Sequence, residues 1–358
     1  MQNKVIHPGI ELDNMLNEKS LSQRDLASRI DVAHSLLNNI LKGKRNINVD
    51  IAIALESAGF KKADYWLMQQ MNYDLNKAQN KEDVIKKTKS IKEWNKIEEQ
   101  GIVPLSFFKK QNVGINTSDD IEKIYSIYGV SDYENLKKRV SEFNPTYFRK
   151  SSKFLENKNN IIAWSVLAKY KAEKIVVPTF SRSNENDLLN ELKKCFNKNE
   201  DVVNESKAIL SKYGIKFFPL SRPSQTPVDG KSFMSGNNPA IVLSLKYKRL
   251  DNFAYTLFHE LGHIFEHLTN SKSPEYRNEE FFVNSSNTEI VEFEADRYAS
   301  NNLIEENLWN DFIISNNEFT DDVVLGFSRK HGIHPGIVRV VFVLNLMNII
   351  GKELLYHR

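Results

Sequence analysis

Two histidines four residues apart in one helical run constrain this chain more than any other feature of its sequence. Residues 258–263 read Phe-His-Glu-Leu-Gly-His and lie inside a segment, 252–268, whose apolar spacing predicts a helix. One helical turn separates the two imidazoles, so both lie on the same face and can share one metal ion. Glu260 lies beside such a metal and stays free to accept a proton. We therefore predict His259 and His263 as zinc ligands and Glu260 as the catalytic general base.

A catalytic zinc site usually has three protein ligands and keeps its fourth position open. Downstream, the predicted helix 289–301 carries Glu292, Glu294 and Asp296. We favour Glu292 as the third ligand, because Asp296 lies one turn further on and can hydrogen-bond the outer nitrogen of a ligand histidine. Glu294 is the competing choice. An alternative without a metal, in which both helices only carry ordinary polar side chains, stays open.

The remaining residues around this motif have several possible roles. His267 continues the row of histidines and could be a fourth ligand, although we favour a structural or supporting role. The donor that would stabilise an oxyanion is left open among His267, Tyr298 and His334. Residues 240–245 predict a strand, which is either an edge strand that binds an extended peptide or a buried strand.

Composition narrows the kind of metal site and the cellular setting. Cys195 is the single cysteine, so a cysteine cage for zinc and an intrachain disulfide are both excluded. No apolar run approaches the length of a membrane span, and the N-terminus lacks the apolar core of a signal peptide. We expect a globular, cytoplasmic protein that has no contact with a membrane.

The N-terminal part contains a second candidate site. Residues 20–30 predict a capped helix, 31–33 a turn and 34–42 a second helix, which is helix-turn-helix order. An inward apolar stripe on the second helix leaves polar side chains outward, and basic residues follow it. The candidate DNA contacts are Gln23, His34, Ser35, Asn38, Asn39, Lys42, Lys44 and Arg45. The formal net charge is only +3, so a DNA interface must be a local patch, and a helical module that binds protein instead is the alternative.

A length of 358 residues predicts more than one domain. We expect an all-α helix-turn-helix domain over 1–76 and a helical connecting region over 77–158. An α+β domain with a small sheet and the two-histidine helix is expected over 159–303, and a C-terminal helical subdomain over 304–358.

Short motifs in the N-terminal part are similar to those of known proteins. They are His-Pro-Gly at 7–9, Leu-Ser-Gln at 21–23, Leu-Lys-Gly-Lys-Arg at 41–45, Tyr-Trp-Leu at 65–67 and Asn-Tyr-Asp-Leu at 72–75. These motifs resemble the Xre-type helix-turn-helix domain of HigA-like antitoxins.

A second set of motifs lies in the other half of the chain. It comprises residues 226–230, 239–245, 249–253, 259–263, 292–296 and 332–338. This set resembles the ImmA/IrrE family of metallopeptidases. The resemblance implies a gluzincin-like fold, with the first glutamate of an ExxxD pattern, here Glu292, as the third zinc ligand. It also implies a regulator that cleaves a repressor protein.

Together, these interpretations predict a DNA-binding transcriptional regulator that is also a zinc-dependent endopeptidase. Its expected partners are an operator, a protein substrate such as a repressor and, because helix-turn-helix modules commonly act as dimers, a second copy of the chain. One alternative is a non-proteolytic, antitoxin-like repressor whose metal site is structural or sensory. Another is an adaptor that binds a partner through the apolar stripe at 84–97.

Overall fold

A computed structural model shows that the protein forms two compact units, Met1–Trp94 and Asn95–Arg358. It describes residues 5–142, 157–224, 226, 228–245, 249–272, 274–276, 280–282, 289–316 and 318–343. The first unit extends beyond the predicted boundary at residue 76. Most of the predicted connecting region, the sheet-containing part and the C-terminal part belong to the second unit. In the described part of the chain, no helix is long and apolar enough to cross a membrane.

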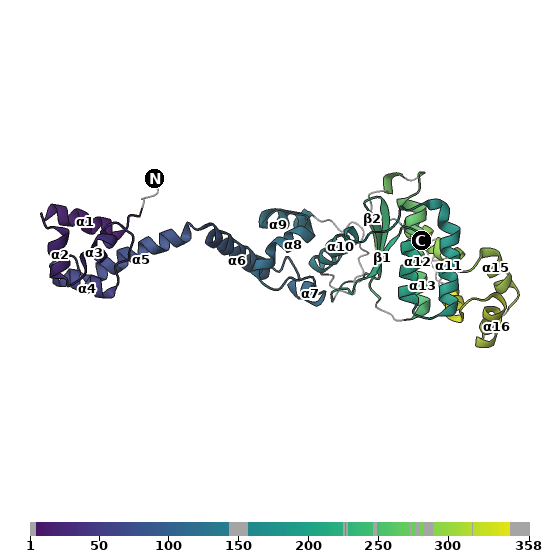
Figure 1. The fold of residues 1–358 in the computed structure, drawn as a ribbon. Helices are drawn as coiled ribbons and strands as arrows, with labels where there is room; N and C mark the ends of the chain where they lie inside the picture. Colours follow the sequence, from purple (N-terminus) through teal and green to yellow (C-terminus); the bar gives the residue numbers. More distant parts are fainter. Residues whose placement is uncertain are drawn as a thin grey trace, which may run out of the picture. The chain divides into compact units, whose positions relative to one another are not determined.

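The described residues of the first unit are helical (Figure 1). The helices are α1 (Pro8–Glu18), α2 (Gln23–Arg29), α3 (His34–Leu41), α4 (Val49–Ser57), α5 (Ala63–Gln79) and the beginning of α6 (Glu82–Gln100). Leu12, Leu37, Leu55 and Trp66 lie in one buried core that joins the first five helices. On α6, Val84, Ile85 and Ile91 remain exposed, so the first part of the predicted apolar stripe is not buried.

A close approach of two helices organises this first unit. The ring of His7 caps α1, because its Nδ1 accepts a hydrogen bond from the backbone N–H of Gly9. A Cβ atom at Gly9 would lie only 1.8 Å from the carbonyl oxygen of Ile40, which belongs to α3. Glycine at this position therefore allows α1 to pack directly against α3.

The second unit combines helices with a small sheet. Its first helices are α7 (Leu105–Lys110), α8 (Ile121–Tyr128), α9 (Tyr133–Glu142), α10 (Lys158–Glu173), α11 (Glu185–Lys198) and α12 (Val202–Lys212), with 3-10 turns η1 (Ser118–Asp120) and η2 (Arg182–Asn184). The indole of Trp164, on the largely buried α10, donates a hydrogen bond of 3.0 Å to the carbonyl of Leu220, just after the first strand. This contact ties α10 to the sheet.

The sheet contains β1 (Lys216–Pro219), β2 (Gly230–Ser235), β3 (Asn238–Leu243) and β4 (Glu280–Phe282), in the order β1-β3-β2-β4. β3 runs parallel to β1, and β2 is antiparallel to both β3 and β4. β3 is therefore an inner strand, which confirms the buried-strand alternative for 240–245 and rules out the edge-strand alternative. The physical reason is the unbroken apolar run from Ala240 to Leu243, which is buried on both faces of the sheet.

The helices that follow the sheet carry the candidate metal ligands. They are α13 (Leu250–Gly262), the π-helical turn η3 (His263–Leu268), the 3-10 turn η4 (Pro274–Tyr276), α14 (Glu289–Leu303), α15 (Glu306–Ile314) and α16 (Asp321–His331), and residues 335–343 are also helical. α13 packs against α14 through a core that includes Phe258, Leu261 and Val291. An all-helical first unit and a mixed second unit match the predicted fold class at this level.

Candidate metal centre and helix-turn-helix surface

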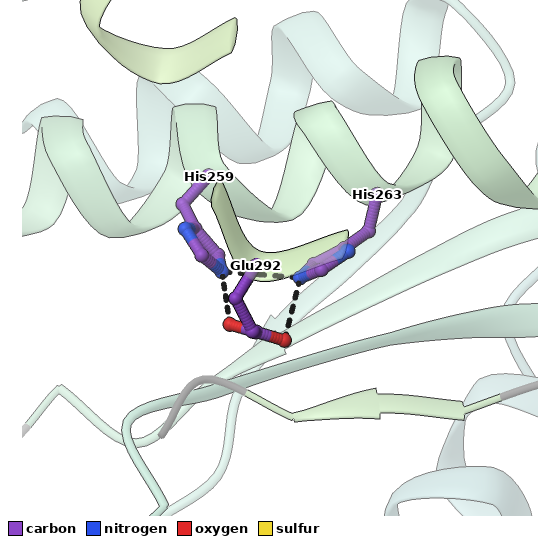
Figure 2. Close-up of side chains that lie close together, drawn as sticks. All are labelled: His259, His263 and Glu292. Atoms are coloured by element: carbon purple, nitrogen blue, oxygen red, sulfur yellow. Dashed lines mark hydrogen bonds and ion pairs between the residues drawn. The ribbon is translucent and has the colours of Figure 1, made fainter. Parts of the chain in front are cut away.

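His259, His263 and Glu292 converge at one point between α13 and α14, as Figure 2 shows. The two Nε2 atoms are 3.1 Å apart. The carboxylate oxygens of Glu292 lie 3.3 Å from Nε2 of His259 and 3.5 Å from Nε2 of His263. The structure thus brings together the three residues that the sequence predicts as zinc ligands.

These distances suit a tetrahedral zinc site. With metal–ligand bonds of 2.0–2.1 Å, neighbouring ligand atoms of a tetrahedron are about 3.3 Å apart. Both histidines are buried, and the side chain of Glu292 is only 19% exposed. Among the residues that the structure describes, no other group of three or more histidine, cysteine or acidic side chains has comparable spacing. The donor atoms present therefore fit zinc as three of its four ligands.

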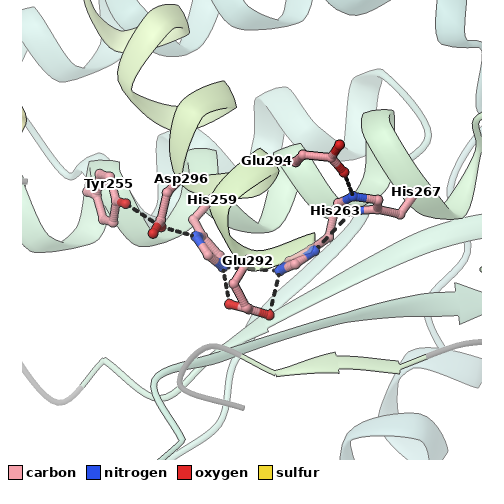
Figure 3. Close-up of polar contacts among 7 residues, drawn as sticks. All are labelled: Tyr255, His259, His263, His267, Glu292, Glu294 and Asp296. Carbon is pink, nitrogen blue, oxygen red and sulfur yellow. Dashed lines mark hydrogen bonds and ion pairs between the residues drawn. The ribbon is translucent and has the colours of Figure 1, made fainter. Parts of the chain in front are cut away.

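Asp296 orients the first histidine. Its Oδ1 atom lies 2.8 Å from Nδ1 of His259, and it also accepts a hydrogen bond from the hydroxyl of Tyr255 (Figure 3). A carboxylate can only accept here, so Nδ1 of His259 carries the proton and Nε2 presents its lone pair to the metal. Burial opposes a charge on His259, but the hydrogen bonds and charges of Asp296 and Glu292 outweigh it and raise its pKa to about 10. Asp296 thus occupies the predicted position beside a ligand.

Glu260 is fully buried, and within the described part of the chain no group lies in good hydrogen-bond geometry with either of its carboxylate oxygens. Burial is the main reason that its pKa rises to about 8, while the charge of a protonated His259 and the nearby Ser232 act in the opposite direction. A raised pKa makes a carboxylate a stronger base, which is the property a proton acceptor needs near neutral pH.

A close approach of β2 shapes the space around Glu260. A Cβ atom at Gly230 would lie 2.4 Å from Oε1 of Glu260. Only a glycine leaves room for the carboxylate at this point of the strand. Sequence reasoning did not single out this residue, because it predicted no strand at 230–235, where the structure has β2.

The other histidines and the tyrosine considered as oxyanion donors are engaged elsewhere. Tyr298 donates a hydrogen bond of 2.8 Å to Glu185. His334 caps the helix at 335–343, since its Nδ1 accepts from the backbone N–H of Gly336 at 3.1 Å. His267 lies 3.0 Å from Glu294, so the competing candidate for third ligand pairs with a histidine outside the cluster.

In the first unit, α2 and α3 form the two helices of the predicted motif. The hydroxyl of Ser22 caps α2 by accepting from the N–H of Asp25 at 3.1 Å, and Asp31 turns the chain with a φ of 51°. Leu37, Ile40 and Leu41 are buried, which confirms the inward stripe of α3.

The candidate DNA contacts lie on or beside these helices with different exposure. His34, Ser35, Lys42, Lys44 and Arg45 are exposed, and Asn38 and Asn39 are half-buried. Gln23 is also half-buried, and its amide donates a hydrogen bond of 3.3 Å to Asp13. The carbonyl of Asn39 accepts from the N–H groups of both Lys44 and Arg45, which holds the basic turn against the end of α3.

Comparison with known proteins identifies this first unit. The sequence profile of the helix-turn-helix family matches residues 12–66. Virulence-associated protein A of Dichelobacter nodosus is 36% identical over 73 residues, which is 20% of this chain and 72% of that protein. The chain belongs to the helix-turn-helix family. In helix-turn-helix proteins bound to DNA, the second helix of the motif lies in the major groove, and α3 is the second helix of the motif here.

Other proteins are also similar to the helix-turn-helix domain. Virulence-associated protein A′ of the same organism is 33% identical over 72 residues, covering 20% of this chain and 62% of that protein. The antitoxin HigA of Pseudomonas aeruginosa, solved with the higBA promoter, is 34% identical over 21% of this chain and 84% of its own, with a TM-score of 0.21. An antidote protein of the HigA family from Coxiella burnetii is 27% identical. The match covers 27% of this chain and 94% of that protein, also with a TM-score of 0.21. The resemblance of the second unit to ImmA/IrrE metallopeptidases stays a prediction.

Proposed function

We propose that this protein is a DNA-binding regulator whose second unit is a zinc-dependent endopeptidase that cuts a regulatory protein such as a repressor. The observation that carries the proposal is the convergence of His259, His263 and Glu292 next to the buried carboxylate of Glu260. Two imidazoles and one carboxylate make the donor set of a catalytic zinc site that keeps one position open.

In this proposal the side chains have separate tasks. His259, His263 and Glu292 hold the zinc, and Asp296 keeps His259 in the tautomer that presents Nε2. Bound zinc supplies a Lewis acid that polarises a peptide carbonyl and lowers the pKa of water. The carboxylate of Glu260 accepts the proton of the attacking water and passes it to the leaving amine.

The environment of Glu260 favours an enzyme over a structural metal site. A structural zinc ion is usually closed by four protein ligands and requires no base beside it. Here a carboxylate is buried next to the first ligand, and no described residue lies in good hydrogen-bond geometry with it, although such burial costs free energy. The burial of Glu260 does not stabilise the fold, and a role in proton transfer explains why a carboxylate is present at this position.

The helix-turn-helix domain supports operator DNA as a partner. The P. aeruginosa relative was solved with its promoter. In this chain, the exposed side chains of His34 and Ser35 at the start of α3 suit contacts with base edges. Lys42, Lys44 and Arg45 at its other end suit phosphates. We propose a dimer on a two-fold symmetric operator, as is usual for such modules.

Metal content is the first test. Elemental analysis of the purified chain is expected to give about one zinc per molecule, lost in both His259→Ala and Glu292→Ala. Glu205→Ala is the matched control, because Glu205 is a partly exposed carboxylate on α12 that pairs with Lys198 at the surface. A chain that holds no zinc, or holds it equally well without Glu292, contradicts the site.

The general base gives the second test. Glu260→Gln removes the proton acceptor but none of the ligands, so the variant is expected to retain zinc and DNA binding and to lose regulation in cells. De-repression that persists in Glu260→Gln would instead favour the non-proteolytic repressor with a structural or sensory metal.

A further inference from the structure

The proposed second ligand, His263, has a polar partner at Nδ1, the ring nitrogen that faces away from the metal position. Nδ1 of His263 lies 3.2 Å from Nδ1 of His267, and Nε2 of His267 lies 3.0 Å from a carboxylate oxygen of Glu294. Figure 3 shows this chain of contacts on one side of the cluster and the chain through Tyr255 and Asp296 on the other. Each ligand histidine thus has its own chain of hydrogen-bond partners.

The order of donors and acceptors in this chain follows from the carboxylate at its end. Glu294 accepts, so the proton of a neutral His267 is on Nε2, and its Nδ1 carries a lone pair. That lone pair accepts the Nδ1–H of His263, which leaves Nε2 of His263 as a lone pair directed at Glu292 and His259.

The backbone that carries His267 is unusual as well. His263–Leu268 forms a π-helical turn, in which the N–H of Thr269 bonds the carbonyl of Ile264 five residues back. π turns are rare and are frequently found at functional sites. The carbonyl of Phe265 in this turn accepts from the guanidinium of Arg182, and that of Ile264 also accepts from the hydroxyl of Thr269 at 2.7 Å. These contacts hold the π turn that places His267 against His263.

We propose that His267 and Glu294 are positioning residues that hold His263 in the tautomer and orientation needed to bind zinc, an inference that rests on the proposed metallopeptidase site. They do for His263 what Asp296 does for His259. As a result, the two Nε2 atoms and the Glu292 carboxylate face one another at 3.1–3.5 Å. The two chains of partners thus direct three ligand atoms at one point and prepare the site for a divalent metal.

The same contacts limit what else His267 can do. Both of its ring nitrogens are engaged, one with His263 and one with Glu294. It is therefore neither a fourth zinc ligand nor a donor to the substrate, and the fourth position of the site stays open.

The test compares zinc affinity of the full chain, measured by competition with a chromophoric chelator, among variants of one residue. His267→Leu removes the acceptor for His263 and is expected to weaken zinc binding by about 10–100-fold. His267→Asn keeps an oxygen acceptor close to the place of Nδ1 and is expected to bind zinc nearly as tightly as the wild type. His331→Leu is the control, since the ring of His331 contacts Phe327 on α16 and no residue of the site.

A second pair of variants covers the case that His267→Leu does not fold. The side chain of Glu294 is 41% exposed, so Glu294→Leu is tolerated structurally and is expected to weaken zinc binding, whereas Glu294→Gln keeps an acceptor and is not. A purely structural role would not produce rescue by the acceptor-keeping variants. Zinc affinity unchanged in His267→Leu, or equally low in His267→Asn, would overturn the inference while leaving the proposed function intact. A wild-type chain that binds no zinc would overturn both.

Discussion

A single methyl group at Gly230 would test how closely β2 approaches the proposed general base. The Cβ atom of an alanine would lie 2.4 Å from Oε1 of Glu260 and 2.8 Å from Cδ2 of Leu243. Non-bonded heavy atoms attract one another at about 3.5 Å, so the overlap with the carboxylate is about 1 Å. The backbone of Gly230 is paired with Leu243 in the sheet, so the carboxylate is the group that must move.

Overpacking of this kind costs about 1–3 kcal/mol of unfolding free energy. At about 2–4 °C per kcal/mol for a unit of this size, Gly230→Ala should lower the melting temperature of the second unit by about 2–12 °C. Gly326→Ala is the matched control, because its Cβ would meet nothing within 4 Å inside helix α16. That control should gain about 0.5–1 kcal/mol from the higher helix propensity of alanine. Calorimetry of the metal-free chain measures both.

A double-mutant cycle identifies the carboxylate as the cause. In a Glu260→Ala background the overlap with Oε1 is gone, so Gly230→Ala should cost at least about 1 kcal/mol less than in the wild type. An equal cost in both backgrounds, or a stabilisation like that of Gly326→Ala, would refute the described approach of β2 to Glu260. This double-mutant cycle measures only stability, so it requires no assay of peptidase activity.

Three further predictions concern the helix-turn-helix domain. Gly9→Ala places a methyl group against the carbonyl of Ile40, so it should destabilise the first unit by about 3 kcal/mol and abolish DNA binding while zinc content stays unchanged. Ser22→Ala removes the cap of α2 and should cost about 1 kcal/mol in denaturant unfolding of that unit, and no loss would mean that the cap is dispensable. Replacing Lys44 and Arg45 with alanine should reduce the salt dependence of DNA binding, log Kd against log salt, by about two units of slope, and an unchanged slope would remove both from the interface.

Several features of the site follow from local sequence alone. The spacing of His259 and His263 places both rings on one face of a helix, and the same argument puts Glu292 and Asp296 on one face of another. Helical periodicity also predicts which side of α3 is buried, because the apolar residues recur every three to four positions. These inferences need only the geometry of one helix.

The tertiary structure decided what depends on how elements pack. Glu292 and Glu294 both occur on α14, and only the packing of α14 against α13 places Glu292 at the cluster and Glu294 at His267. The apolar run at 240–245 is compatible with an edge strand or an inner strand, and pairing with β1 and β2 makes it an inner one.

The approach of Gly230 to Glu260 joins residues that are distant in the chain, so no local pattern contains it. The sequence by itself thus determined the helices that carry the candidate residues, which of their side chains share a face and which chemistry they offer. Only the tertiary structure decided which side chains and strands contact one another across different elements. The reason is that burial and hydrogen bonding between distant segments depend on the packing of the whole unit.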